Sequence, residues 1–111
     1  MSTERFARTP AAPYYAVIFT SQRTDVAQGY DDMAQRMVQL AERQPGFLGA
    51  ESARDASGFG MTISYWDSLA SITNWKAHPE HLVAQAAGRA DWYARYALRV
   101  CKVERADTFI A

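Results

Sequence analysis

The chain has 111 residues, a length typical of one domain and sufficient to bury a core without disulfides or a structural metal. Its 12 Lys and Arg balance its 12 Asp and Glu, so it lacks the net basic charge with which nucleic-acid-binding proteins neutralise phosphates. With 49% hydrophobic and 22% charged residues, the composition also excludes a mainly disordered chain. Aromatic residues, at 13%, are in excess.

The cysteine count and the first residues indicate a compartment. Cys101 is the single cysteine, so no intrachain disulfide can form and a reducing cytoplasm is the expected location. Residues 1–13 carry charges and two prolines but not the apolar segment of a signal peptide, and no later run is long enough to span a membrane. We expect a flexible N-terminal arm over 1–13, one folded domain over 14–111, and neither nucleic acid nor membrane among the partners.

The first half of the chain predicts a strand followed by a helix. Residues 14–19 are continuously apolar and rich in β-formers, which is typical of a strand buried on both faces. Apolar residues then repeat at helical spacing over 26–44, with Asp25 as the expected N-cap and Gln28 as its reciprocal partner. The pair Pro45-Gly46 ends this helix.

Two further strands are predicted at residues 47–54 and 59–66. The segment between them, Asp55-Ala56-Ser57-Gly58, has the residues of a hairpin turn, in which Gly58 is free to take a positive φ. On the later strand, Trp66 shares a face with small residues, which leaves room for a helix or for a ligand.

The last part of the chain predicts a broken helical region and a final strand. Asp67 or Ser68 can cap the first helix, and Pro79 suits the start of the next. A further turn is expected over 90–95, before a strand over 98–105.

The predicted order is β-α-β-β-α-β, which is the ferredoxin-like α+β arrangement with an antiparallel sheet. In this arrangement the helices cover one face of the sheet only. Because residues 14–19 are apolar throughout, the other face must also be covered. A second copy of the chain, packed sheet to sheet in a symmetric homodimer, would cover it.

The sequence resembles the antibiotic biosynthesis monooxygenase (ABM) family of the dimeric α/β-barrel superfamily. The resemblance runs from Tyr14 to Arg105 and rests on a series of short motifs in a fixed order: Gln44-Pro45-Gly46-Phe47-Leu48-Gly49, Ser64-Tyr65-Trp66, Ile72-Thr73-Asn74-Trp75-Lys76 with His78 and His81, Gly88-Arg89, and Trp92-Tyr93. It implies a dimeric α/β barrel. The superfamily includes quinol-forming monooxygenases, haem-degrading enzymes, dehydratases and isomerases.

The resemblance implies two kinds of oxygen chemistry. Members that oxygenate polycyclic aromatics use no metal, flavin or other cofactor, because the substrate carbanion itself reduces O₂. Such a reaction needs an aromatic-lined apolar cavity, a general base and a donor for the developing oxyanion. Haem-degrading members place an Asn on the first strand, a Trp after the third and a His ligand on the second helical segment. Trp66 and His78 suit two of these places, but the first strand has no Asn.

His78 and His81 flank Pro79-Glu80 at the start of a helix, so both rings can point to one side. Imidazole titrates near neutral pH, which makes either histidine a candidate general base or proton shuttle. The alternative is that His78 caps the helix and His81 lies on the surface. A zinc site at His-Pro-Glu-His is weaker, because the sequence offers no clear third ligand.

Four aromatic residues are candidates for substrate contact: Trp66, Trp75, Trp92 and Tyr93. Trp66 serves equally as a core residue or as a pocket wall that stacks on a flat substrate. Trp75 falls in line with apolar neighbours at helical spacing, which favours core packing. Trp92 and Tyr93, near Tyr96, suit a cavity lining or a dimer interface.

Arg99 is the remaining candidate catalytic residue, since its guanidinium could hold a substrate oxyanion. If it is buried it needs a carboxylate partner, for which Glu51 and Asp67 are available. The resemblance, with these candidate residues, thus implies cofactor-independent oxygenation of a small aromatic or quinol-type metabolite. The alternatives are a dimer that binds a small apolar ligand without catalysis, and a haem-binding or haem-degrading protein.

Overall fold

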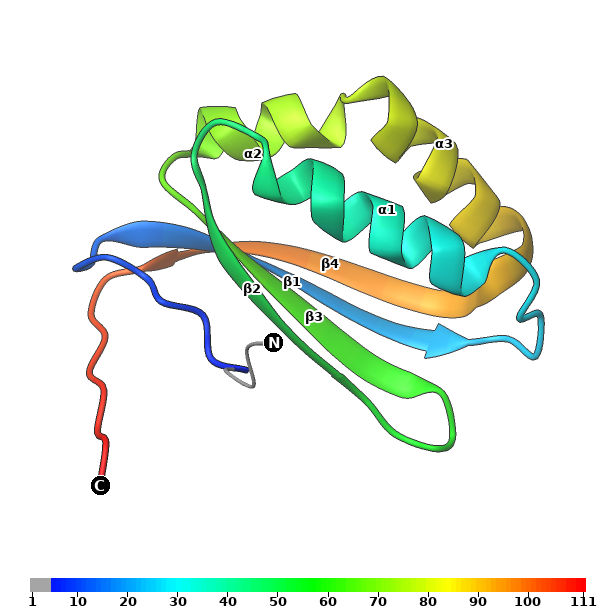
Figure 1. Cartoon of the computed structure of the whole chain (residues 1–111), viewed down its shortest axis with the longest axis horizontal. Helices are drawn as coiled ribbons and strands as arrows, with labels where there is room; N and C mark the ends of the chain where they lie inside the picture. The colour runs from blue at the N-terminus through cyan, green and yellow to red at the C-terminus, as the bar shows by residue number, and fades with distance from the viewer. Residues whose placement is uncertain (1–4) are drawn as a thin grey trace.

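A computed structural model describes residues 5–111 of the chain. Its elements, shown in Figure 1, are β1 (Tyr14–Arg23), α1 (Tyr30–Glu42), β2 (Phe47–Arg54), β3 (Phe59–Trp66), α2 (Leu69–Lys76), α3 (Pro79–Ala87), the π-helical turn η1 (Gly88–Trp92) and β4 (Tyr93–Val103). The strands form one sheet in the order β2-β3-β1-β4, and neighbouring strands are antiparallel. The predicted ferredoxin-like α+β fold is confirmed.

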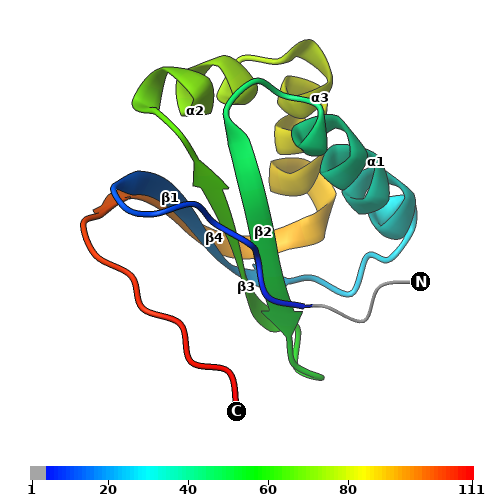
Figure 2. The same ribbon diagram turned by 60° about the vertical axis from the view of Figure 1, so that its left-hand side comes forward.

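All three α-helices lie on one side of the sheet (Figures 1 and 2). The ring of Phe19 in β1 lies 5.2 Å from that of Tyr93, which in turn lies 6.1 Å from that of Tyr30 in α1, so odd-numbered residues of β1 point to the helices. Even-numbered residues point to the opposite side, which we call the open face. Through the strand register, its members are Tyr14, Ala16, Ile18, Thr20 and Gln22 of β1, Phe59, Met61, Ile63 and Tyr65 of β3, Gly49, Glu51 and Ala53 of β2, and Arg95, Ala97, Arg99, Cys101 and Val103 of β4.

Part of the N-terminal arm packs against the open face. The backbone N–H of Ala7 donates to the Glu51 carboxylate at 3.1 Å, and the Thr9 hydroxyl donates to that of Tyr14 at 3.0 Å. These contacts leave Tyr14 only 5% exposed. The flexibility predicted for 1–13 stays a prediction, and residues 1–4 lie outside the described part of the chain.

The predicted start of the first helix is wrong. The helix begins at Tyr30, after Gly29 with φ of 79°, and Asp25 is not its N-cap. The segment before it is held to η1 instead. The backbone N–H of Thr24 donates to the Trp92 carbonyl at 2.9 Å, and the Trp92 indole N–H donates to the Gln28 carbonyl at 3.1 Å. These partners are distant in sequence, so no local sequence pattern predicts the hydrogen bonds between them.

The other element boundaries follow the sequence more closely. The bounds predicted for β2 and β3 are confirmed, and Ser68 caps α2 by accepting the backbone N–H of Ser71 at 3.1 Å. The last strand begins at Tyr93, five residues earlier than predicted, because η1 ends at Trp92 and Tyr93 pairs at once with Arg23. Within the described residues, no helix is long and apolar enough to cross a membrane.

Candidate functional site

His81, in the first turn of α3, is stacked on Trp75 of α2. The ring centres are 4.2 Å apart and the ring planes differ by 15°. Nδ1 of His81 lies 2.9 Å from the Trp75 carbonyl oxygen. Because a carbonyl can only accept, Nδ1 carries the hydrogen and the lone pair of the neutral ring resides on Nε2.

The surroundings of His81 keep this ring neutral. Burial disfavours the imidazolium and lowers the pKa of His81 below its usual 6.5, and the nearby charge of His78 acts in the same direction. At pH 7 the ring therefore carries an unprotonated Nε2. Among the contacts of the described residues, none occupies this nitrogen. An imidazole in this state can take a proton from a bound molecule.

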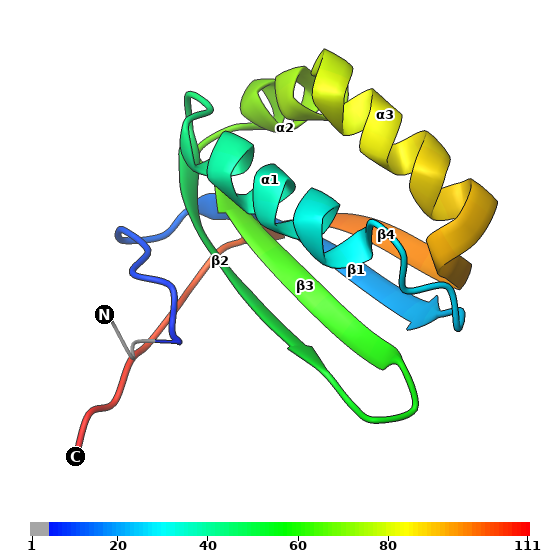
Figure 3. The same ribbon diagram turned by 45° about the vertical axis from the view of Figure 1, so that its right-hand side comes forward.

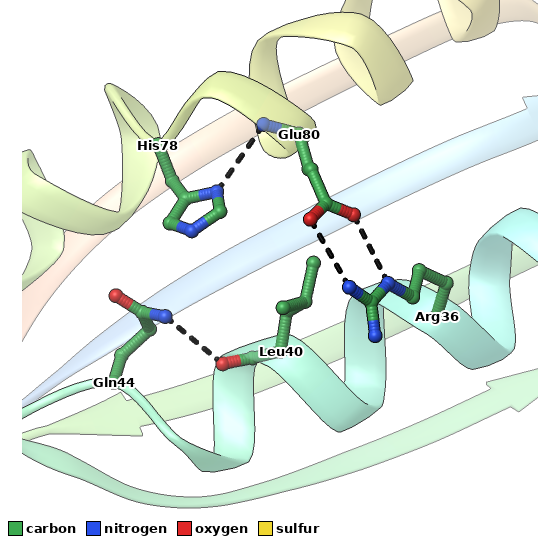
Figure 4. Close-up of polar contacts among 5 residues, drawn as sticks. All are labelled: Arg36, Leu40, Gln44, His78 and Glu80. Atoms are coloured by element: carbon green, nitrogen blue, oxygen red, sulfur yellow. Dashed lines mark hydrogen bonds and ion pairs between the residues drawn. The ribbon is translucent and has the colours of Figure 1, made fainter.

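His78 contacts the same tryptophan but has a different protonation pattern. Its ring centre lies 5.5 Å from that of Trp75, so both histidine rings contact one tryptophan, as rings that can point to one side would. Nδ1 of His78 accepts the backbone N–H of Glu80 at 3.2 Å and thereby caps α3 (Figure 4). Since this bond uses the Nδ1 lone pair, the neutral ring holds its hydrogen on Nε2. His78 thus acts as a helix cap here.

The break between α2 and α3 creates this arrangement. Pro79 occupies the first position of α3, where its missing N–H costs nothing. The chain turns before it, and the His78 backbone N–H donates to the Trp75 carbonyl at 3.1 Å. The side-chain amide of Gln85 donates to the Lys76 carbonyl at 3.1 Å and holds α3 to the end of α2. These contacts fix the Trp75 carbonyl opposite His81.

An exposed ion pair joins α1 to α3 beside the histidines. The Arg36 guanidinium donates to both carboxylate oxygens of Glu80, at 3.0 and 3.1 Å (Figure 4). The hydrogen bond from Arg36 lowers the pKa of Glu80. An open hollow of about 300 Å³ lies between the two helices, lined by Gly29, Asp32, Met33, Arg36, Glu80 and Val83. None of the aromatic candidates lines it.

Trp66 lies wholly in the core, with 0% of its surface exposed. Its indole N–H donates to the Ser64 hydroxyl at 2.9 Å, and its ring meets that of Phe47 edge to face at 5.3 Å. In this structure the residue therefore has no free face or polar edge to offer a ligand.

Trp92 and Tyr93 lie near the opposite end of the sheet from Trp66. Trp66 pairs with Tyr15 and Tyr93 with Arg23, so about 26 Å of β1 separates the two positions. Trp92 is 8% exposed. The Tyr93 hydroxyl lies 3.5 Å from that of Tyr30, and burial raises the pKa of Tyr93, which keeps its phenol protonated. The four aromatic candidates do not form one cluster.

Arg99 lies on the open face, across the sheet from both histidines, because it pairs with Ile18. Arg99 is exposed, and neither Glu51 nor Asp67, the partners available to a buried arginine, pairs with it, since the one ion pair among the described residues joins Arg36 to Glu80. The Glu51 carboxylate instead accepts the Tyr65 hydroxyl at 2.5 Å. Within the described residues, no cluster of three His, Cys, Asp or Glu side chains could hold a metal ion.

Sequence reasoning missed an apolar surface beside the helices. Leu98 and Val100 of β4 share the helix side of the sheet with Phe19 and Val17. They are nevertheless 49% and 48% exposed, so no helix covers this strand fully. Figures 1 and 3 show α3 passing above β4. The alternation around Arg99 places both residues on one face but gives no sign that this face is uncovered.

Comparison with known protein families identifies the family of this chain. Residues 13–87 match the family described as antibiotic biosynthesis monooxygenase. The chain belongs to this ABM family. This ABM protein is 52% identical over 103 residues to the uncharacterized protein YqjZ of Bacillus subtilis (strain 168), covering 93% of this chain and 90% of YqjZ.

Solved structures share the fold at low sequence identity. A mutant form of SnoaB, a cofactor-independent oxygenase from Streptomyces nogalater, superposes with a TM-score of 0.73 at 16% identity, covering 86% of this chain and 97% of SnoaB. Protein SO0527 from Shewanella oneidensis gives a TM-score of 0.74 at 6% identity, covering 85% of this chain and 94% of that protein. These similarities support the ferredoxin-like fold of this ABM protein.

Proposed function

We propose that this ABM protein is a cofactor-independent monooxygenase for a small aromatic, quinol-type molecule, with His81 as the general base. The observation that carries the proposal is the 2.9 Å contact between Nδ1 of His81 and the Trp75 carbonyl, which places the Nδ1 hydrogen on this bond and leaves Nε2 to accept a proton. Membership of the ABM family and the fold shared with the oxygenase SnoaB support the reaction class.

The reaction requires one proton acceptor and a substrate that can itself reduce O₂. For an anthrone-type substrate, Nε2 of His81 removes a proton from the ring CH₂ group, and the resulting carbanion passes its electrons to O₂ with formation of a C–O bond. Proton return to the peroxide gives a hydroperoxide; loss of the remaining C–H proton then forms the carbonyl as the O–O bond breaks and the departing hydroxide, with that proton, leaves as water. The CH₂ group becomes a carbonyl, and the substrate supplies all the electrons.

His81 suits this role better than His78. A base must offer a lone pair at the working pH, and burial ensures that His81 does so by lowering its pKa. The Nδ1 lone pair of His78 is engaged by the Glu80 backbone N–H at 3.2 Å, and the same bond argues against His78 as a haem ligand. The uncovered side chains of Leu98 and Val100 offer an apolar surface for the substrate ring.

We also propose that the ABM protein is a cytoplasmic homodimer formed through the open face. Met61 and Phe59 on this face are each 45% exposed, and Cys101 is an exposed free thiol, which suits a reducing compartment. A second copy would cover this face. Light scattering at micromolar concentration should give twice the mass of the chain, and a monomeric mass would contradict the dimer.

Oxygen uptake over a panel of anthrones and hydroquinones tests the activity. One O₂ should be consumed per substrate, and one ¹⁸O atom from ¹⁸O₂ should enter the product, in chelator-treated protein. Tight binding of the panel without oxygen uptake would favour the ligand-binding alternative. A Soret shift with equimolar hemin that disappears in a histidine variant would favour haem binding.

A further inference from the structure

The first turn of α3 is held by a hydrogen bond that only an unprotonated histidine can accept. The backbone N–H of Glu80 donates to Nδ1 of His78 at 3.2 Å, and this contact is the side-chain cap of the helix (Figure 4). Both ring nitrogens of an imidazolium are donors, so protonated His78 cannot accept this bond. Imidazole ordinarily titrates near pH 6.5. Capping and protonation of His78 therefore exclude each other, and the choice between them falls close to neutral pH.

His81 lies in the turn that this cap stabilises. The backbone N–H of Leu82, the next residue, donates to the His78 carbonyl at 2.9 Å and closes that turn. The His81 ring meets Trp75 across the break between α2 and α3, through the 2.9 Å contact of Nδ1 with the Trp75 carbonyl and the stacking of the two rings. Release of the turn would draw His81 away from the carbonyl that fixes its tautomer.

Charged groups from three elements surround His78. On α3, the bond from Arg36 of α1 and, to a smaller extent, the charge of His78 lower the pKa of Glu80. Attraction to this carboxylate would turn a protonated His78 ring away from the Glu80 N–H. Burial lowers the pKa of His81, and the charge of His78 lowers it further, while Lys76 ends α2 two residues before the cap. The positive end of the helix dipole also repels an imidazolium at the cap, so protonation favours loss of the capping bond.

The neighbouring helix α2 has a cap without this sensitivity. The Ser68 hydroxyl accepts the backbone N–H of Ser71 at 3.1 Å. A serine hydroxyl does not titrate between pH 5 and 8, so α2 stays capped throughout this range. The two helices therefore provide a pair of caps in one molecule, of which only the cap of α3 responds to pH.

We infer that His78 is a pH-dependent positioning residue for His81: its neutral ring caps α3 and keeps His81 against Trp75, and its protonation releases this turn. The inference rests on the function proposed above, in which His81 is the base. It adds a second group that must be neutral for the reaction, although this group touches neither the substrate nor the reacting atoms. Acid then stops the reaction twice, by protonating the base and by loosening the turn that holds it.

Hydrogen exchange followed by NMR tests the cap without any measurement of activity. Between pH 7.5 and 5 the protection factor of the Leu82 amide in wild type should fall about 2- to 30-fold, the range that loss of an N-cap implies. His78→Asn retains a cap that does not titrate, so its Leu82 amide should keep the protection it has at the higher pH. The Ile72 amide of α2, which donates to the Ser68 carbonyl at 3.4 Å, is the control within each protein. An equal fall in wild type and His78→Asn, or no fall in wild type, would overturn the inference.

The pH dependence of oxygen uptake separates this inference from the proposed function. If both histidines must be neutral, the acid limb of log kcat/KM against pH should reach a slope of about 2 in wild type and about 1 in His78→Asn. At the higher pH, His78→Ala should be about 2- to 30-fold slower than wild type, and His78→Asn should recover most of the rate. A slope of about 1 in wild type as well would overturn the inference and leave His81 as the base. Absence of oxygen uptake together with the expected exchange result would support the pH-dependent cap and overturn the proposed function alone.

Discussion

Replacing Trp66 tests whether this residue belongs to the core, as the structure indicates, or to a substrate pocket. The side chain is fully buried and its indole N–H has one partner, the Ser64 hydroxyl at 2.9 Å. Ser64→Ala leaves that buried N–H without a partner, which should cost about 1–3 kcal/mol of the free energy of unfolding. Trp66→Ala removes the ring as well and should cost about 3–5 kcal/mol.

A double-mutant cycle isolates the bond between the two side chains. Trp66→Phe removes the donor, so Ser64→Ala should cost little in that background, which gives a coupling free energy of about 0.5–3 kcal/mol. Urea unfolding at one fixed protein concentration is the measurement, because dimer formation would add a concentration dependence. Ser52→Ala, at an exposed position of β2, is the control and should stay within about 0.5 kcal/mol. An equal cost of Ser64→Ala in both backgrounds would refute the reasoning.

Three further predictions concern the helices and the turn before β2. Burial lowers the pKa of His81, so its NMR titration midpoint should lie below 6.5. Because the unfolded state then binds more protons, the free energy of unfolding should fall as the pH drops from 6.5 through that midpoint. A titration midpoint at or above 6.5 would contradict this prediction. Gly46→Ala should destabilise the fold by more than about 1 kcal/mol, since the φ of Gly46 is +86° and the new Cβ would collide with Ser71 and Asp67. A midpoint of urea unfolding equal to that of wild type would show that the turn adapts. Ser68→Ala should cost about 0.5–2 kcal/mol in the same assay through loss of the α2 cap, whereas Ser68→Asp should cost much less.

The strands and the hairpin could be read from the sequence because their signals are local. Alternation and the Asp55–Gly58 turn predict β2 and β3 with correct bounds, and Ser68 identifies the start of α2. The start of α1 could not be read in this way. It depends on Trp92, which lies more than sixty residues later and binds the Gln28 carbonyl. A cap that looks favourable at Asp25 is overridden by this distant contact.

The candidate site, like the fold, could be predicted from the sequence only in part. The spacing of His78 and His81 allows both rings to point to one side, and in the structure both contact Trp75. Which histidine is the better base depends on hydrogen bonds to the Trp75 carbonyl and the Glu80 backbone N–H, and these are set by the fold around Pro79. For Arg99, alternation places its side chain on the opposite face from those of Leu98 and Val100, but its pairing with Ile18 and the side of the sheet that the helices occupy are properties of the whole chain.

The central claim is that His81 provides the base for oxygenation, and one comparison of rates tests it most directly. Oxygen uptake with a reactive anthrone is measured for wild type, His81→Gln and His78→Asn; glutamine can still donate to the Trp75 carbonyl, and asparagine can still cap α3. We predict that His81→Gln lowers the rate at least ~100-fold, as expected for loss of a general base, while His78→Asn keeps most of it. A His81→Gln protein that folds and turns over at the wild-type rate would contradict the account.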